Sequence, residues 1–350
     1  MRQEIKIAQI GLGHWGQNLL RNFINNPRAD VVAICDHDQK QIDRALLIAP
    51  AARVYSCINE LLNNPDIQAV SIATPSGEHF THASAALKAG KAVFVEKPMT
   101  MSLKDAVALA KISSDTGQLV MVGHTYLYNS IVQNVKEHVS SGVLGDVYYA
   151  YGQRLNLGKF RHDCDVIWTL APHDISIFNY WFDDCPHQVS ARTLSYVGQN
   201  AGHAEICFAQ LDYANGISAH LHLSWLDPQK VRRSVIAGSK KMLVYDDVDQ
   251  SRPIQLYDKS RELNDIISGN SQGYNSTMRA GDVHILDVST KEPLYLELDH
   301  FIDCILNDAP CSSDVYHGLE VALIMDALSR SANNNGAPIS IEHPRQSREI

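Results

Sequence analysis

Short apolar runs alternate with amphipathic stretches along the N-terminal part of the chain. Buried β-strands are predicted for the apolar runs, which are residues 5–10, 31–35, 69–72, 92–95 and 119–122. Helices are predicted where apolar side chains recur at helical spacing, in residues 17–25, 78–88 and 102–116. Ser102 is an expected N-cap and Gly117 an expected helix end. Repeated strand–helix units of this length predict a parallel, doubly wound sheet.

The pattern changes beyond residue 123, where strands follow one another with few intervening helices. Alternating or β-forming residues predict strands at residues 147–157, 188–197, 204–213, 217–225 and 231–245. Asn215-Gly216 is a strong hairpin signal between two of them. Helices are expected near residues 130–141, around residue 173 and over residues 313–332. A mostly antiparallel sheet with helices on one face is therefore predicted.

The prediction is an α/β fold with two domains. Residues 1–123 form a Rossmann-type, doubly wound parallel sheet, and residues 124–350 form an α+β domain with a large, mostly antiparallel sheet. The final segment of the second domain could pack back on the first. Residues 247–292 are polar and rich in glycine and serine, which favours a long excursion that serves as a lid or a partner contact.

Charge and composition narrow the class of protein. The formal net charge of −9 argues against nucleic acid or an anionic membrane as the main partner. The N-terminus lacks the apolar stretch of a signal peptide, and no uncharged run approaches the ~18 apolar residues of a membrane span. The cysteines show no Cys-x-x-Cys spacing, so we expect reduced thiols in a cytoplasmic protein.

A glycine-rich turn follows the first strand directly. The stretch Gly11-Leu12-Gly13-His14-Trp15-Gly16 lies between a strand and a helix, which is the context that makes G-x-G-x-x-G indicate a dinucleotide site. Gly11 makes the tight turn, Gly13 lets the backbone approach a pyrophosphate, and Gly16 allows the helix to pack closely on the strand. The phosphates would sit at the helix N-terminus. His14 and Trp15 are further candidate contacts.

A carboxylate ends the second strand. Asp36 stands about 20 residues beyond the glycine motif, where an acidic side chain binds the adenosine ribose hydroxyls and repels a 2′-phosphate. No arginine follows immediately, so NAD is predicted rather than NADP. Thr74 and Pro75 end another strand on the same edge and are expected to line the cofactor cleft. His79 and Glu96 complete the candidate cofactor residues.

Lys97 follows the apolar run 92–95 in the sequence Glu96-Lys97-Pro98. An ammonium is costly to hold near an apolar strand end, and the proline restricts the backbone of the residue before it. A lysine at a later strand end of such a sheet falls beside the reactive ring of the cofactor. It could hold or protonate the oxygen in a hydroxyl-to-carbonyl redox step. The alternative is a surface lysine that closes a strand.

Taken together, these features resemble the Gfo/Idh/MocA oxidoreductases. They are the glycine-rich start, the strand-end carboxylate, the second antiparallel domain, and the motifs Ala73-Thr74-Pro75 and Glu96-Lys97-Pro98. The resemblance implies NAD(P)-dependent oxidation or reduction of a sugar, inositol or nucleotide-sugar hydroxyl. It also implies that Lys97 contacts the reacting oxygen.

The second catalytic region of that family is usually Asp-x-Gly-x-His-x-x-Asp. The corresponding stretch here runs from Thr169 to Ser176, and His173 matches the catalytic histidine. Thr169 stands where the first aspartate is common, and Asp174 could orient the histidine instead. His173 is therefore predicted as the acid–base group, since the histidine pKa lies near neutrality.

The candidate substrate contacts come from the second domain and from the segment after the last Rossmann strand. Arginine and amide side chains suit hydroxyl, carboxylate or diphosphate groups. The predicted set is Tyr126, Arg154, Asn156, Arg161, Trp168, Thr169 and His173. No metal site is expected, because His220 and His222 share a strand face without an obvious third ligand.

The function predicted from the sequence is an NAD-dependent dehydrogenase that acts on CH–OH groups of a small sugar or cyclitol, in a homodimer or homotetramer. A nucleotide sugar or amino sugar is favoured because of the arginines in residues 154–161. Alternatives are an inositol or free-sugar dehydrogenase, a glycosidase that recycles bound NAD, and a non-catalytic sensor of NAD and sugars. The presence of both Lys97 and His173 argues against the sensor.

Overall fold

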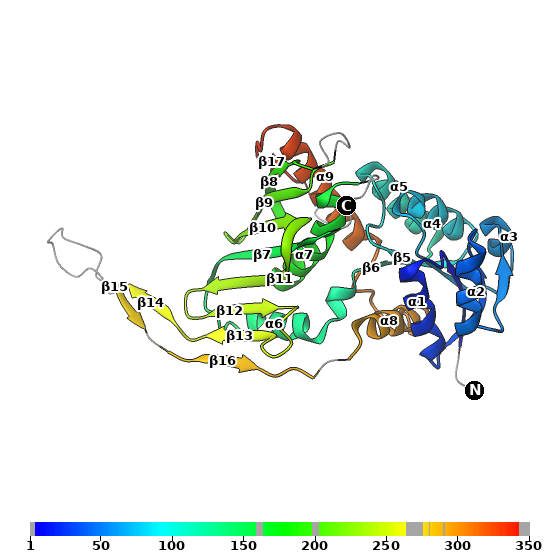
Figure 1. Ribbon diagram of the computed structural model, residues 1–350, viewed down its shortest axis with the longest axis horizontal. Coiled ribbons are helices and arrows are strands. Elements are labelled where there is room, and N and C mark those ends of the chain that lie inside the picture. The colour runs from blue at the N-terminus through cyan, green and yellow to red at the C-terminus, as the bar shows by residue number, and fades with distance from the viewer. Residues whose placement is uncertain are drawn as a thin grey trace. The chain divides into compact units, whose positions relative to one another are not determined.

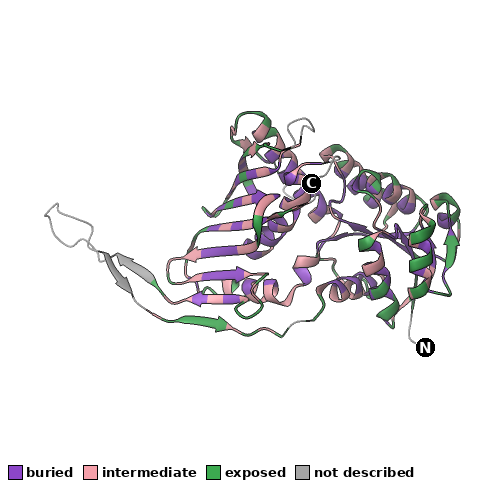
Figure 2. Ribbon diagram, viewed as in Figure 1, coloured by how far each residue is buried: buried purple, intermediate pink, exposed green. Residues whose placement is uncertain are grey.

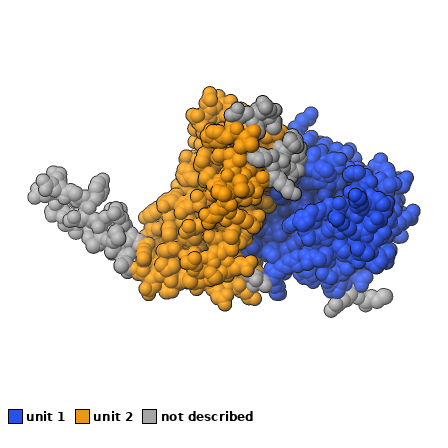
Figure 3. Space-filling model, in the orientation of Figure 1, with its two compact units in different colours: residues 1–129, 291–326 blue, residues 130–290, 327–350 orange. Residues whose placement is uncertain are grey.

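The protein divides into two compact units in a computed structural model that describes residues 4–158, 164–197, 203–263, 276–279, 281–289 and 291–342. Unit 1 comprises residues 1–129 and 291–326, and unit 2 comprises residues 130–290 and 327–350 (Figure 3). Unit 1 therefore extends a few residues beyond the predicted boundary at residue 123 and also takes in a later segment of the chain. Each unit is described by itself.

Unit 1 is built on a parallel sheet. Among its described residues the sheet has six strands in the order β3-β2-β1-β4-β5-β6, of which Figure 1 labels β5 and β6. The strands are β1 Ile5–Ile10, β2 Ala29–Cys35, β3 Arg53–Tyr55, β4 Ala69–Ile72, β5 Ala92–Glu96 and β6 Val120–Gly123. Every residue of β4 and β5 is buried (Figure 2), as expected for parallel strands that helices cover on both faces. The predicted doubly wound sheet is confirmed.

Unit 1 contains the helices predicted near residues 17–25, 78–88, 102–116 and 313–332, and further helices at residues 39–48, 58–62 and 293–307 that were not predicted. They are α1 His14–Asn25, α2 Gln39–Ile48, α3 Ile58–Leu62, η1 Ser76–Glu78, α4 His79–Lys88, α5 Leu103–Thr116, η2 Thr125–Tyr128, α8 Pro293–Asn307 and the greater part of α9 Val315–Asn333. The Ser102 side chain accepts a hydrogen bond from the Asp105 amide, and Gly117 ends α5 at φ +67°. The predicted cap and stop of this helix are thus confirmed.

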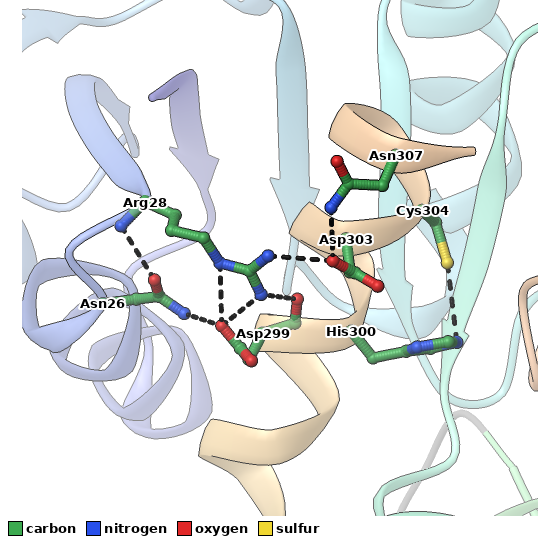
Figure 4. Close-up of polar contacts among 7 residues, drawn as sticks. All are labelled: Asn26, Arg28, Asp299, His300, Asp303, Cys304 and Asn307. Carbon is green, nitrogen blue, oxygen red and sulfur yellow. Dashed lines mark hydrogen bonds and ion pairs between the residues drawn. The ribbon is translucent and has the colours of Figure 1, made fainter. Parts of the chain in front are cut away.

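Helix α8 returns to unit 1 from far along the chain and is fixed there by ion pairs. Arg28, which precedes β2, donates to the Asp299 carboxylate at 2.5 Å and to the Asp303 carboxylate at 2.9 Å (Figure 4). Asn26 donates to the same Asp299 oxygen at 2.8 Å. These contacts attach one face of α8 to the turn between α1 and β2.

Unit 2 is built on a larger sheet. Its described strands number nine, in the order β16-β13-β12-β11-β7-β10-β9-β8-β17. Only the β7–β10 pair is parallel among the described pairs, so the predicted mostly antiparallel sheet is confirmed. The strands are β7 Val147–Leu157, β8 Pro186–Leu194, β9 Ile206–Tyr213, β10 Ser218–Ser224, β11 Leu226–Gly238, β12 Met242–Asp246, β13 Ile254–Tyr257, β16 Val283–Leu286 and β17 Ile339–Ser340. A separate pair is formed by β14 Ser260–Leu263 and β15 Ser276–Arg279.

Two helices of unit 2, α6 Ser130–Ser140 and α7 Val166–Phe182, belong to the same core. Side chains alternate across β9, where Cys207 and Leu211 are buried and Phe208 is exposed. A Cβ on Gly152 of β7 would lie 3.2 Å from the Phe178 ring of α7, so helix and strand approach closely there. This close approach fixes α7, which carries the predicted catalytic histidine.

One predicted strand is wrong. Residues 231–245 form two antiparallel strands, β11 and β12, because the chain turns at residues 239–241. Gly238 allows this turn to pack against the Leu144 carbonyl, which a Cβ would approach to 2.3 Å. By contrast, the hairpin predicted at Asn215-Gly216 is confirmed, with Gly216 at φ +87° between β9 and β10.

Candidate active site

The glycine turn after β1 leads into a helix whose first amides have no side-chain cap. Gly11 has φ +82°, and a Cβ there would lie 2.6 Å from the Ala73 carbonyl. A Cβ on Gly16 would lie 2.0 Å from the Gly11 oxygen, so α1 can pack this closely only with glycine at that position. Gly13 is the N-cap of α1 and provides no side-chain cap for the helix amides. The first turn of α1 can therefore hydrogen-bond phosphate oxygens.

Asp36 is fixed at the end of β2 by the same turn. Its Oδ2 accepts a hydrogen bond from the Leu12 amide at 2.6 Å, and its Oδ1 accepts one from the Asp38 amide at 2.9 Å. The nearby carboxylate and burial raise the pKa of Cys35 to about 11, with burial as the larger cause, so its thiol stays neutral. The carboxylate of Asp36 can accept further hydrogen bonds from ribose hydroxyls.

A cleft of about 610 Å³ runs along this edge of the sheet. Gly11, Gly13, Asp36, Thr74 and Pro75 line it, which brings five predicted cofactor residues together. Among the described residues that line the cleft, none is a lysine or an arginine. The open helix end and the carboxylate therefore fit a dinucleotide.

His79 lies behind the cleft lining. Its ring is buried and bonds to two backbone carbonyls, that of Pro98 at 2.8 Å through Nδ1 and that of Thr74 at 3.0 Å through Nε2. Burial lowers the pKa of His79, although the two carbonyls oppose this effect. The histidine thus ties the segment after β4 to the segment after β5.

Glu96 and Trp15 join the glycine motif to the end of β5. The Trp15 indole Nε1 donates to the buried Glu96 carboxylate, and the Lys97 amide donates to its other oxygen at 3.2 Å. Burial raises the pKa of Glu96 to about 7, although the Lys97 charge opposes this rise. Lys97 itself is half-buried at the strand end. The geometry places Lys97 at the ligand-binding edge of the sheet.

A group of polar side chains, each buried or half-buried, lies near this strand end, and none of them is among the predicted site residues. Thr125 donates to Glu297 at 2.7 Å, and burial together with nearby Glu96 raises the pKa of Glu297 well above its ordinary value. His124 and His317 meet edge to face, with ring centroids 5.0 Å apart. Burial lowers the pKa of His124 well below its ordinary value, and His317 and Lys97 lower it further. These pKa shifts favour the neutral forms of Glu297 and His124 near Lys97.

In unit 2, α7 carries the predicted histidine one turn after Thr169. Asp165 caps the helix by accepting from the Trp168 amide at 3.1 Å, and Thr169 donates its hydroxyl to the Asp165 carbonyl at 2.5 Å. His173 is half-buried, and Ser176 donates to its carbonyl at 2.9 Å. The Trp168 indole donates to Ser329 at 3.3 Å. The structure thus brings Trp168, Thr169 and His173 onto one helix.

Arg154 and Asp174 form a buried ion pair between β7 and α7. The Arg154 Nε donates to Asp174 Oδ2 at 2.6 Å, and Nη2 donates to Oδ1 at 3.0 Å. Asp174 thus pairs with the arginine, and no described contact shows it orienting His173. Asn156 is half-buried on the same strand as Arg154, and Tyr126 is half-buried in unit 1. Arg161 lies outside the described residues.

Comparison with known protein families shows which family the chain belongs to. Residues 5–124 match the family described as "Oxidoreductase family, NAD-binding Rossmann fold", and residues 132–244 match the "GFO/IDH/MocA C-terminal domain". The chain belongs to the Gfo/Idh/MocA oxidoreductases. It is thus an NAD(P)-dependent oxidoreductase, and the resemblance inferred from the sequence is confirmed.

Relatives within this Gfo/Idh/MocA family differ in cofactor. The chain is 23% identical over 359 residues to scyllo-inositol 2-dehydrogenase (NAD(+)) of Bacillus subtilis, which covers 99% of this chain and 98% of the relative. It is 30% identical over 242 residues to scyllo-inositol 2-dehydrogenase (NADP(+)) IolW of the same organism, which covers 67% and 64%. The family alone therefore leaves NAD and NADP open.

Two further comparisons concern a shorter match and a structure. The chain is 34% identical over 147 residues to 1-carboxy-3-chloro-3,4-dihydroxycyclohexa-1,5-diene dehydrogenase of Comamonas testosteroni, covering 42% of this chain and 37% of that relative. The fold superposes with a TM-score of 0.79 on an oxidoreductase of Magnetospirillum magnetotacticum MS-1, which is 27% identical and covers 93% of this chain and 100% of the other. In the described part of this Gfo/Idh/MocA chain, no helix is long and apolar enough to cross a bilayer.

Proposed function

We propose that this oxidoreductase is an NAD-dependent dehydrogenase of a ring hydroxyl in a sugar or cyclitol. The observation that carries the proposal is Lys97 at the end of β5, on the edge where the glycine turn opens the helix end. Asp36 and the amides of the first turn of α1 would hold NAD, which would supply the hydride acceptor for oxidation of the carbon that bears the hydroxyl. The Lys97 ammonium would hold the oxygen and stabilise its developing charge. His173 would take the hydroxyl proton in oxidation and return it in reduction.

The choice of NAD is supported by the charges of the cleft. Asp36 and Asp38 both line it, as does Glu78, and a 2′-phosphate would be repelled by these carboxylates. One of the cited relatives is named as an NADP(+) enzyme, so this choice is a property proposed for this chain.

The substrate proposal differs in emphasis from the sequence prediction. A nucleotide sugar or amino sugar was favoured because of the arginines in residues 154–161, but the Arg154 guanidinium is paired with buried Asp174. That pairing removes one reason to expect a diphosphate group in the substrate. Two relatives are named as inositol dehydrogenases, which supports a cyclitol or free sugar.

A homo-oligomer is part of the same proposal. On the face of the unit 2 sheet opposite Cys207 and Leu211, Phe208 is 47% exposed and stacks on His222, with ring centroids 4.5 Å apart. Exposed aromatic side chains on a sheet face favour burial against a second copy. Light scattering should give the mass of a dimer or tetramer, and a monomer at micromolar concentration would contradict this part.

The experiment for the catalytic proposal is a substrate panel. Inositols, free sugars and nucleotide sugars are each incubated with NAD or NADP, and the absorbance of the reduced nicotinamide is followed. We expect reduction of NAD with a cyclitol or sugar and a lower kcat/KM with NADP. If the chain binds NAD but none of the substrates in the panel leads to reduced NAD, the dehydrogenase proposal fails. Product analysis on glycosides would then test bond cleavage with recycled NAD.

A further inference from the structure

Three metal-binding side chains converge at the C-terminal end of α8 in unit 1. His300 and Cys304 lie one turn apart on the helix, and Cys311 comes from the segment that follows it. The histidine nitrogen and the two sulfurs all lie within 4.8 Å of one another. Figure 4 shows His300 and Cys304 pointing toward each other from α8. These residues are separate from the glycine turn and its cleft.

The spacing of these atoms suits a tetrahedral ion. Zinc bonds of about 2.3 Å to sulfur and about 2.0–2.1 Å to nitrogen place neighbouring ligand atoms about 3.5–3.8 Å apart. The distance from His300 Nε2 to Cys304 Sγ is 3.5 Å. The thiol of Cys311 is a hydrogen-bond partner of Cys304. One ion could therefore replace the present contacts with little movement of the three side chains.

The nitrogen that faces the sulfurs offers a lone pair. The Ser312 amide donates to His300 Nε2 at 3.3 Å, so this nitrogen is a hydrogen-bond acceptor and a metal ion would compete with the amide for it. Cys304 is 7% exposed, whereas His300 and Cys311 are half-buried. The Tyr128 ring covers the histidine, with centroids 5.6 Å apart. The cluster is thus screened from water but open on one side.

The segment that carries Cys311 is held in place. The Val122 amide of β6 donates to the Ser313 carbonyl at 2.8 Å, and Met121 forms an isolated antiparallel bridge with Asp314. Asp314 in turn accepts from the His317 amide at 2.8 Å at the start of α9. Because this segment is fixed to the sheet, the ligands need little ordering when an ion binds.

We propose that His300, Cys304 and Cys311 bind one zinc ion, with a fourth position open to water. Two thiolates and an imidazole form a donor set that binds zinc in preference to magnesium or calcium. The ion would fasten the end of α8 to the segment that pairs with β6. The sequence analysis expected no metal site, because His220 and His222 have no obvious third ligand. The spacing His-x3-Cys-x6-Cys is not a recognised ligand pattern, and the strand that positions Cys311 is far away in sequence.

The test measures zinc in the full-length chain, reduced and then desalted without chelator. Metal content is determined by mass spectrometry, and affinity by competition with a chromogenic chelator. We expect about one zinc per chain, and at least about 10-fold weaker binding in Cys304→Ser and Cys311→Ser. Cys185→Ser, in unit 2, is the matched control and should bind zinc like the natural chain. Zinc should also raise the Tm of the natural chain but not that of the two ligand variants.

Cobalt(II) provides a second measurement that needs no variant. Thiolate-to-cobalt charge transfer and intense tetrahedral d–d absorption are expected when cobalt binds the reduced chain, and zinc should displace both. The proposal is overturned if zinc does not compete with the chelator. It also fails if Cys304→Ser and Cys311→Ser retain zinc like the control, or if cobalt gives no thiolate band. An intact mass showing a Cys304–Cys311 disulfide that resists reduction would equally overturn it.

Discussion

Replacing Glu96 with glutamine should change how stability depends on pH. The carboxyl group is buried at the end of β5, and burial raises its pKa from 4.5 to about 7. The folded protein therefore keeps a proton that the unfolded chain releases, so unfolding becomes easier as pH rises from about 4.5 to about 7. Glutamine keeps an oxygen that can accept from Trp15 Nε1 but has no proton to lose.

The size of the effect follows from the two pKa values. One pKa unit corresponds to about 1.36 kcal/mol, so a move from 4.5 to about 7 corresponds to about 3 kcal/mol. The free energy of unfolding of Glu96→Gln, relative to the natural chain, should increase by about this amount between pH 4 and pH 8. Glu297 adds to the change in the same direction, because nearby Glu96 contributes to its raised pKa.

Urea unfolding followed by circular dichroism at several pH values measures this difference. Titration of the histidines common to both proteins cancels when the two curves are subtracted. Glu342→Gln, at an exposed glutamate, is the control and should give a flat difference. A difference between Glu96→Gln and the natural chain that is equally flat from pH 4 to pH 8 would refute the reasoning, since it would mean that Glu96 is not held neutral by burial.

Two further substitutions test other parts of the structure. Asp174→Ala should cost about 3–5 kcal/mol of unfolding free energy because it removes the carboxylate from a buried ion pair with Arg154. Asp115→Ala, in an exposed pair with Lys111, should cost under about 1 kcal/mol. Equal urea midpoints for the two variants would contradict this. Asp36→Ser should raise the ratio of kcat/KM for NADP to that for NAD by about 10-fold or more, because it removes a charge that repels the 2′-phosphate, and an unchanged ratio in steady-state assays would count against that role.

Local sequence signals predicted the elements that depend on neighbouring residues. The fully buried strand β5 reads as an apolar run, and the Ser102 cap lies directly before its helix. The glycines of the first turn were predicted for reasons that the structure bears out, since a Cβ on Gly11 or Gly16 would meet backbone atoms. For the Ser102 cap and for Gly16 the cause lies within a few residues of the signal, whereas Gly11 is required by its close approach to Ala73.

Features that depend on distant contacts could not be predicted in this way. Helix α8 was not predicted, and nothing in the sequence around Glu297 indicates that it lies near Glu96. The Arg154–Asp174 pair joins a strand to a helix, and no sequence spacing marks such a pair. Its sequence position predicts Arg154 as a substrate contact and gives no sign of the Asp174 carboxylate. Tertiary packing, rather than local pattern, decides these cases.

The central claim is that Lys97 acts on the reacting oxygen while the glycine turn and Asp36 hold the cofactor. Its most direct test compares Lys97→Ala with the natural chain on the substrate that the panel identifies, measuring kcat and the Kd for NAD. The account predicts that kcat falls by about 10²–10⁴-fold while the Kd changes only a few-fold, and that Lys104→Ala, at an exposed lysine of α5, changes neither. A Lys97→Ala enzyme that keeps its kcat within a few-fold would contradict the account.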